Sequence, residues 1–76
     1  MNTPKIHGIY RHYKGDSYIV EAIATHSETG ELMVVYRGLY DDAPLYARPL
    51  ELFLDEVNKN GQKLRFELQD IKSVRN

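Results

Sequence analysis

The sequence contains no cysteine, no tryptophan and no long apolar run, and these absences exclude several classes of protein. Without cysteine, neither disulfides nor cysteine-ligated zinc can stabilise this chain of 76 residues. No apolar stretch approaches the roughly 20 residues of a membrane helix, and the polar N-terminal segment is unlike a secretory signal. We therefore expect a cytoplasmic protein that does not enter a membrane. A chain of this length has room for one core, which predicts a single domain over residues 1–76.

An excess of charge of either sign is also lacking. Ten Lys and Arg residues oppose eleven Asp and Glu residues, and the formal net charge is −1. This balance excludes a protein that binds nucleic acid through its overall charge. Any site for an anion must therefore be a local patch of basic residues.

Residue patterns that support catalysis or cofactor binding are missing as well. The five glycines are scattered singly, so the chain has no glycine-rich phosphate loop. His7 and His12 fall on opposite faces of one predicted strand, and the sequence offers too few other ligands to complete a four-ligand zinc site. His26 and Ser27 are neighbours on an extended segment and point to opposite faces, so we interpret them as part of a turn. We predict no enzymatic activity, no cofactor and no metal.

Alternating polar and apolar residues predict a mostly β protein. We expect strands over residues 8–14, 18–26, 32–37, 46–48 and 62–68, and an amphipathic helical turn at about 50–57. About five short strands with one helical turn before the last are typical of a small SH3-like barrel. Residues 7–68 are expected to form the ordered barrel and residues 69–76 a flexible tail. The predicted core consists of Ile9, Val20, Ala22, Ala24, Val34, Tyr36, Leu50, Phe53, Val57, Leu64 and Phe66.

Several separated motifs follow one another in a recognisable order. They are the segments 7–15, 18–20, 24–29, 34–37 and 48–50, together with Tyr40, Phe53, Arg65 and Phe66. In this order they resemble the small bacterial family called domain of unknown function 1653, over about residues 7–67. The sequence departs from the family's pattern at Tyr46, where a tryptophan is expected, and at Leu64, where a proline is frequent. The resemblance implies a fold with a suggested capacity to bind nucleic acid, and it implies no catalytic residue.

Tyrosine is the most over-represented aromatic residue, with six tyrosines beside two phenylalanines. A tyrosine joins an apolar ring to a polar hydroxyl, which suits both core packing and surfaces that stack on bases. Tyr18 and Tyr36 lie on apolar faces of their predicted strands, and we assign them to the core. The other four flank polar residues, and both roles stay open for Tyr10, Tyr13, Tyr40 and Tyr46.

Basic residues alternate with these tyrosines. Aromatic rings beside cations are what single-stranded nucleic acid requires of a binding surface. We therefore predict a weak nucleic-acid-binding module, for single strands or RNA, with a site formed by Arg11, Tyr13, Lys14, Arg37, Tyr40, Tyr46 and Arg48.

Two other interpretations of the same residues stay open. The arginines fit a solvated strand face on which they pair with carboxylates. The tyrosines fit an adaptor module that binds a protein or peptide in an aromatic groove. The charge around the tyrosines discriminates between the ligands, because nucleic acid requires basic neighbours and a cationic ligand requires acidic ones.

Overall fold

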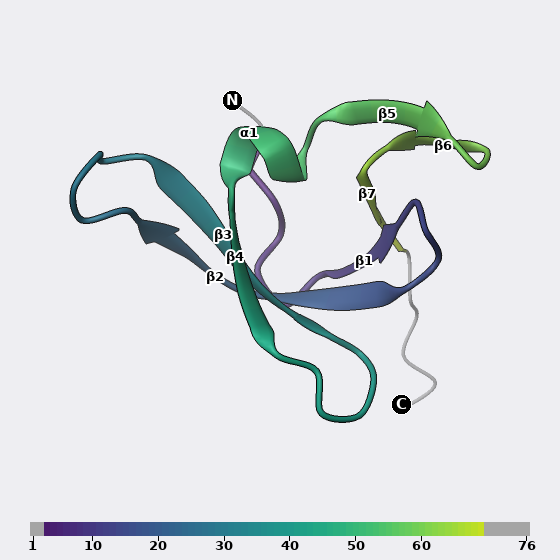
Figure 1. Cartoon of the computed structure of the whole chain (residues 1–76), viewed down its shortest axis with the longest axis horizontal. Coiled ribbons are helices and arrows are strands. Elements are labelled where there is room, and N and C mark those ends of the chain that lie inside the picture. The colour runs from purple at the N-terminus through teal and green to yellow at the C-terminus, as the bar shows by residue number, and fades with distance from the viewer. Residues whose placement is uncertain (1–2, 70–76) are drawn as a thin grey trace, which may run out of the picture.

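The computed structural model describes residues 3–69, which form seven short strands and one helical turn (Figure 1). Five strands form an antiparallel sheet in the order β4-β3-β2-β1-β7, and β5 pairs with β6 in a separate hairpin. No helix among the described residues is long and apolar enough to span a membrane. The elements are β1 (Ile9–His12), β2 (Ser17–Thr25), β3 (Leu32–Gly38), β4 (Leu45–Pro49), α1 (Leu50–Phe53), β5 (Glu56–Lys59), β6 (Gln62–Leu64) and β7 (Phe66–Leu68).

The first four strands follow one another as a meander, joined by short polar turns. The turn from β1 to β2 is closed by the amide of His12, which donates to the carbonyl oxygen of Asp16 at 2.8 Å. It also requires Gly15, whose φ of +116° is strained for any residue with a side chain. Local turn chemistry therefore determines where these strands end.

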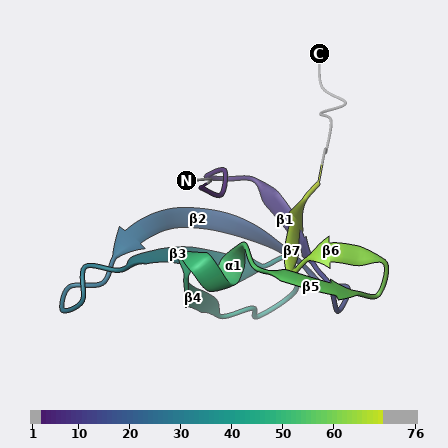
Figure 2. The ribbon, with the colours of Figure 1, turned by 90° about the horizontal axis from the view of Figure 1, so that it is seen from above.

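The core lies on one face of the sheet and includes residues of α1 and β7. Figures 1 and 2 show α1 following β4 at one edge of the sheet. The rings of Phe53 and Phe66 stack with centroids 4.1 Å apart and planes at 4°. The edges of Tyr10 and Tyr36 meet the Phe53 ring at 5.4 and 5.3 Å, in the edge-to-face geometry that aromatic pairs prefer. The buried residues are Tyr10, Val20, Val34, Tyr36, Leu50, Phe53 and Phe66.

The mostly β fold and the single helical turn agree with the prediction, but the sheet does not close into a barrel. β4 and β7 form its two edges and do not pair with each other. α1 continues directly from β4, and Phe53 of α1 packs on Phe66 of β7. The two edges are thus connected by side-chain packing instead of by a ladder of backbone hydrogen bonds. The closed SH3-like barrel is not confirmed.

A β-bulge explains part of the error in the predicted core. The register between β2 and β3 shifts between Val20 and Ala22, so strict alternation fails at Glu21. Ala22 and Ala24 consequently leave the core face, and Ile23 packs against the core in their place. In β1 the buried residue is Tyr10, and its neighbour Ile9 is only half-buried.

The C-terminal third also differs from the prediction. The helix ends at Phe53, and Val57 lies in β5. The expected last strand is divided at Arg65, so that Leu64 lies in β6 and only β7 joins the large sheet. Val57 and Leu64 are therefore half-buried and lie outside the core cluster, whereas Leu54 packs against it. The amide of Gln69 donates to the carbonyl oxygen of Ile9 at 2.8 Å, and the rest of the expected tail, residues 70–76, lies outside the described residues.

Candidate functional site

Strand β4 presents polar and aromatic side chains on the same face of the sheet as the core. Its register places Tyr46 beside Tyr36 and Arg48 beside Val34. Because Val34 and Tyr36 are buried, and partners across a ladder share a face, Tyr46 and Arg48 extend the core face toward solvent. The core thus forms the floor of a surface at this edge of the sheet.

Aromatic rings continue from this floor to the solvent. Tyr36 contacts Tyr46 and Tyr18 at centroid distances of 5.5 and 5.4 Å, and Tyr18 contacts Tyr40 at 6.2 Å. Tyr40 is 45% exposed and Tyr46 is 40% exposed. The Tyr40 ring lies against Gly38, where a Cβ atom would overlap it. Glycine at position 38 therefore lets the exposed Tyr40 fold back onto the buried rings.

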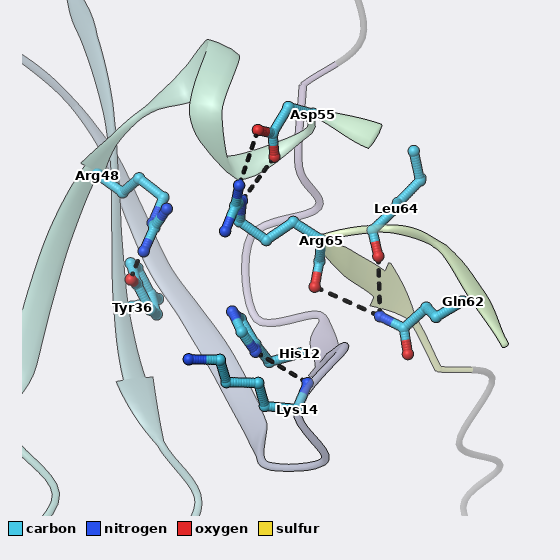
Figure 3. A network of polar contacts seen from close by, with 8 residues as sticks. All are labelled: His12, Lys14, Tyr36, Arg48, Asp55, Gln62, Leu64 and Arg65. Carbon is cyan, nitrogen blue, oxygen red and sulfur yellow. Dashed lines mark hydrogen bonds and ion pairs between the residues drawn. The ribbon is translucent and has the colours of Figure 1, made fainter. Parts of the chain in front are cut away.

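Three cations from three different parts of the chain, Lys14, Arg48 and Arg65, lie around His12 and Tyr36 (Figure 3). The Arg48 guanidinium carbon lies 5.8 Å from the Phe66 ring centroid, and Arg48 Nε donates to the Tyr36 hydroxyl at 3.3 Å. The Arg65 guanidinium carbon and Lys14 Nζ lie 5.8 and 6.0 Å from the Tyr13 ring centroid. Cations at these distances from ring faces are attracted by the ring quadrupole.

Arg65 is held in place by a carboxylate. Its Nε and Nη2 donate to Oδ1 and Oδ2 of Asp55 at 2.7 and 3.1 Å, which is the bidentate geometry of the stronger ion pairs. The hydrogen bonds from Arg65 lower the pKa of Asp55. Arg65 lies between β6 and β7. The ion pair with Asp55 determines the orientation of its guanidinium.

The pKa of His12 reflects the electrostatic potential at this surface. Its ring contacts Phe66 at 4.8 Å and Tyr13 at 4.5 Å between centroids, and its Nδ1 accepts a hydrogen bond from the Lys14 amide at 3.1 Å. Burial lowers the pKa of His12, and the charges of Arg48, Arg65 and Lys14 lower it further. Three cations therefore act on one imidazole, and the potential around it favours an anion.

Acidic residues also lie near the aromatic cluster. Burial, together with the charge of Asp16 in the β1–β2 turn, raises the pKa of Tyr18. Asp41 and Asp42 are exposed in the loop that follows Tyr40. The tyrosines thus lie between a basic end, at Lys14 and the two arginines, and an acidic end at the tip of the β3–β4 hairpin.

The structure brings together five of the seven residues predicted as the site. Tyr13, Lys14, Tyr40, Tyr46 and Arg48 surround His12, Tyr18 and Phe66, and with Arg65 they form what we call the basic aromatic surface.

The other two predicted residues lie elsewhere. Arg11 and Arg37 alternate with the buried Tyr10 and Tyr36, so they project from the back face of the sheet. Arg37 Nε pairs there with Glu21 Oε2 at 3.1 Å. The β2–β3 register sets Arg37 opposite Ile19, two residues from Glu21 in the same strand.

Sequence reasoning did not select Arg65, because alternation through a single strand over 62–68 placed it on the outer face. The strand break at Arg65 reverses that assignment. The sequence feature that could have identified Arg65 is its position directly before Phe66. His26, by contrast, serves its turn as expected, since its Nδ1 accepts hydrogen bonds from the amides of Glu28 and Thr29. No cluster of three potential metal ligands occurs within residues 3–69.

Comparison with known proteins identifies the family. The family described as "Protein of unknown function (DUF1653)" matches residues 8–68. A crystal structure of a DUF1653 protein from Bordetella bronchiseptica is similar to this chain, with 36% sequence identity and a TM-score of 0.70, covering 87% of this chain and 83% of that one. Among curated proteins, none matches. The chain belongs to the DUF1653 family.

Proposed function

We propose that this DUF1653 protein is a weak, largely sequence-independent binding module for single-stranded nucleic acid, DNA or RNA. The observation that carries the proposal is the convergence of Lys14, Arg48 and Arg65 on a row of aromatic rings, at the basic aromatic surface. Cations that track phosphates beside rings that stack on bases are the two components of sequence-tolerant single-strand binding.

The cations are available for phosphate. Lys14 and Arg48 form no ion pair within the described part of the chain. Arg65 has one carboxylate partner, Asp55, which accepts hydrogen bonds from Nε and Nη2. Because the net charge of the protein is near zero, binding depends on these few groups and is expected to be weak.

The tyrosines supply the stacking platforms. Tyr40 and Tyr46 expose almost half of their area and are supported from below by Tyr18 and Tyr36. A supported ring loses little conformational freedom when a base stacks on it, so its contribution to binding is retained. We expect each Tyr→Ala change at these two positions to cost roughly 1–3 kcal/mol of binding free energy.

The test is a salt titration of binding to a fluorescent oligonucleotide. Three phosphate contacts, by Lys14, Arg48 and Arg65, predict that log affinity falls against log salt with a slope of about −2, since each contributes roughly −0.7 on a single strand. Arg48→Gln should reduce the slope by about 0.7 and weaken binding. The matched control is Arg37→Gln, which removes an arginine from the back face and should leave binding unchanged. Equal effects of the two variants would contradict the proposal.

A second candidate function has a specific observation in its favour. The exposed Tyr40 directly precedes Asp41 and Asp42 and lies in the field of Asp16, and aromatic rings with acidic neighbours suit a cationic side chain of a protein or peptide. This adaptor function predicts binding of a lysine- or arginine-rich peptide that is lost in Asp42→Asn and retained in Arg48→Gln. Under the nucleic-acid function, the two variants have the reverse effects.

Both candidates are binding functions, and we propose that the chain alone does not catalyse a reaction. The side chains of the basic aromatic surface are an ammonium, guanidinium groups, phenols and the half-buried imidazole of His12, which are suited to holding charge and stacking. A turnover that survives purification and is lost through one substitution on this surface would contradict this part of the proposal.

A further inference from the structure

A hollow adjoins the basic aromatic surface, between the β1–β2 turn and the β5–β6 hairpin. Its volume is about 440 Å³, within the range of small-molecule sites. The residues that matter for its chemistry are Arg11, Tyr13, Lys14, Asn60, Gln62 and Glu67. Tyr13 and Lys14 form the rim between this hollow and the basic aromatic surface.

The walls of the hollow are fixed to each other. Asn60 Nδ2 donates to the carbonyl oxygen of Tyr13 at 3.1 Å, and Gln62 Nε2 donates to that of Arg11 at 2.8 Å. Asn60 and Gly61 have φ values of 52° and 74°, the left-handed conformation of a tight hairpin turn. Side chains distant in sequence therefore hold the two turns together, and the hollow exists before any ligand binds.

One wall of the hollow is cationic. Arg11 and Lys14 are exposed and form no ion pair within residues 3–69. A ligand in this hollow would give the Arg11 guanidinium a function, because it forms no ion pair with any described residue on the back face. A guanidinium beside an ammonium is suited to a phosphate monoester.

Acceptors lie beside these cations. Glu67 is the ladder partner of Arg11 and shares its face of the sheet. Glu67 Oε2 receives the amides of Lys63 and Leu64 at 3.0 and 3.1 Å, which fixes the carboxylate. No described residue donates to Glu67 Oε1 or to Asn60 Oδ1. A ligand that combines an anionic end with an amine therefore matches both the cations and the acceptors of the hollow.

We propose that this hollow binds a nucleotide, with its phosphate on Arg11 and Lys14 and the exocyclic amine of its base on Glu67 and Asn60. The choice of a nucleotide rests on the proposed function, because Tyr13 and Lys14 line both sites. Two sources supply the same chemistry: a free nucleoside monophosphate, or the 5′-phosphorylated end of a strand that continues over the basic aromatic surface.

The first experiment titrates the isotope-labelled protein with cytidine monophosphate and uridine monophosphate, followed by NMR. We expect shifts confined to residues 11–15, 60–62 and 67–69, with several-fold tighter binding of the cytidine compound, which carries the amine. Arg11→Gln should weaken binding about tenfold, the loss of one charge-assisted hydrogen bond, and the control Arg37→Gln should not. The proposal is wrong if the hollow shows no shifts, or if the two arginine variants behave alike.

The second experiment separates this inference from the proposed function. Oligonucleotides with a 5′-hydroxyl and a 5′-phosphate are compared on wild type, Arg11→Gln and Arg48→Gln. Tighter binding of the phosphorylated strand that disappears in Arg11→Gln supports the hollow as a site for a strand end. If both strands bind equally and depend only on Arg48, the proposed function stands and the inference about the strand end fails. If neither strand binds but cytidine monophosphate does, the proposed function fails and the hollow is a site for a free nucleotide.

Discussion

Both faces of the sheet carry arginines, but the side chains that surround these arginines differ between the two faces. On the back face, Arg37 pairs with Glu21 across neighbouring strands, and both side chains are partly exposed. On the basic aromatic surface, Arg48 lies over Phe66 and donates to Tyr36 without a carboxylate partner. An arginine that pairs with a carboxylate on an open strand contributes little to a site, whereas an arginine supported by buried rings presents a fixed charge. The neighbours, and not the residue type, distinguish the two faces.

The largest effect should come from removing the floor of the basic aromatic surface. Phe53 is fully buried and stacks on Phe66, so Phe53→Ala should lower the free energy of unfolding by about 3–5 kcal/mol. Chemical denaturation followed by tyrosine fluorescence measures the change. Leu52→Ala, at a neighbouring exposed position, is the control and should cost below about 0.5 kcal/mol. Similar losses in both variants would show that α1 does not support this face.

A smaller effect is expected from releasing Arg65. Asp55→Asn removes the carboxylate that holds the guanidinium at 2.7 and 3.1 Å. Because both side chains are partly exposed, we expect a stability loss of only about 1 kcal/mol. The comparison with the back face becomes sharper if Glu21→Gln, which breaks the pair with Arg37, costs less in the same thermal-melting measurement. A larger cost for Glu21→Gln would reverse the ranking of the two faces.

His12 allows the two faces to be compared through pH. Burial and the three nearby cations lower its pKa in the folded state below the ordinary 6.5. The unfolded chain therefore takes up a proton on His12 at a higher pH than the folded chain does. Stability is complete above pH 6.5 and decreases as the pH falls through this value toward the folded pKa. Asp55, whose pKa is lowered from 3.8, gives a separate loss only in more acidic solution.

The measurement is denaturant unfolding of wild type and His12→Gln between pH 7.5 and 5. The wild-type free energy of unfolding should decline across this range, and the variant should decline less. A phosphate bound beside His12 would favour its protonated form, so oligonucleotide affinity should rise as the pH falls. His26→Gln, which changes the histidine of the β2–β3 turn, is the control. Parallel profiles for wild type and His12→Gln would contradict the assignment.

The smallest effect is expected on the back face. Arg37→Gln breaks one exposed ion pair, at 3.1 Å from Glu21, and should change stability by about 0–1 kcal/mol. Thermal melting measures this, and the same sample serves as the binding control. A loss well above this range would show that the back face is more than a solvated strand surface.

Sequence reasoning predicted the strands of the meander well, because alternation and turn residues are local signals. It predicted the site only in part. Placing Tyr46 and Arg48 on the core face requires the register between β3 and β4, which alternation alone does not supply. Arg11 and Arg37 were misplaced because each directly follows a buried tyrosine and therefore points to the opposite face. The bulge at Glu21, which moved Ala22 and Ala24 off the core face, has no reliable signature in a single sequence.

The C-terminal third was harder to predict for a related reason. Residues 62–68 alternate perfectly as one strand, yet the chain turns at Arg65, where Asp55 captures the guanidinium. This break depends on a contact between residues ten positions apart that no periodicity encodes. The open sheet also depends on a long-range side-chain contact. Phe53 and Phe66 stack on each other, whereas a closed barrel would need direct pairing of the two edge strands.

The pairing of β7 with β1 has a consequence for the order in which the molecule folds. The meander of the first four strands pairs neighbours in sequence, whereas β7 must reach β1 across more than fifty residues, as in the pair Tyr10 and Leu68. Loop-closure entropy delays such distant contacts relative to local hairpins. Lys14 and Arg48 belong to the early meander, and Arg65 arrives with β7. The three cations meet only when the last strand docks, so a nascent or partly folded chain carries no complete basic aromatic surface, and binding would report the finished fold.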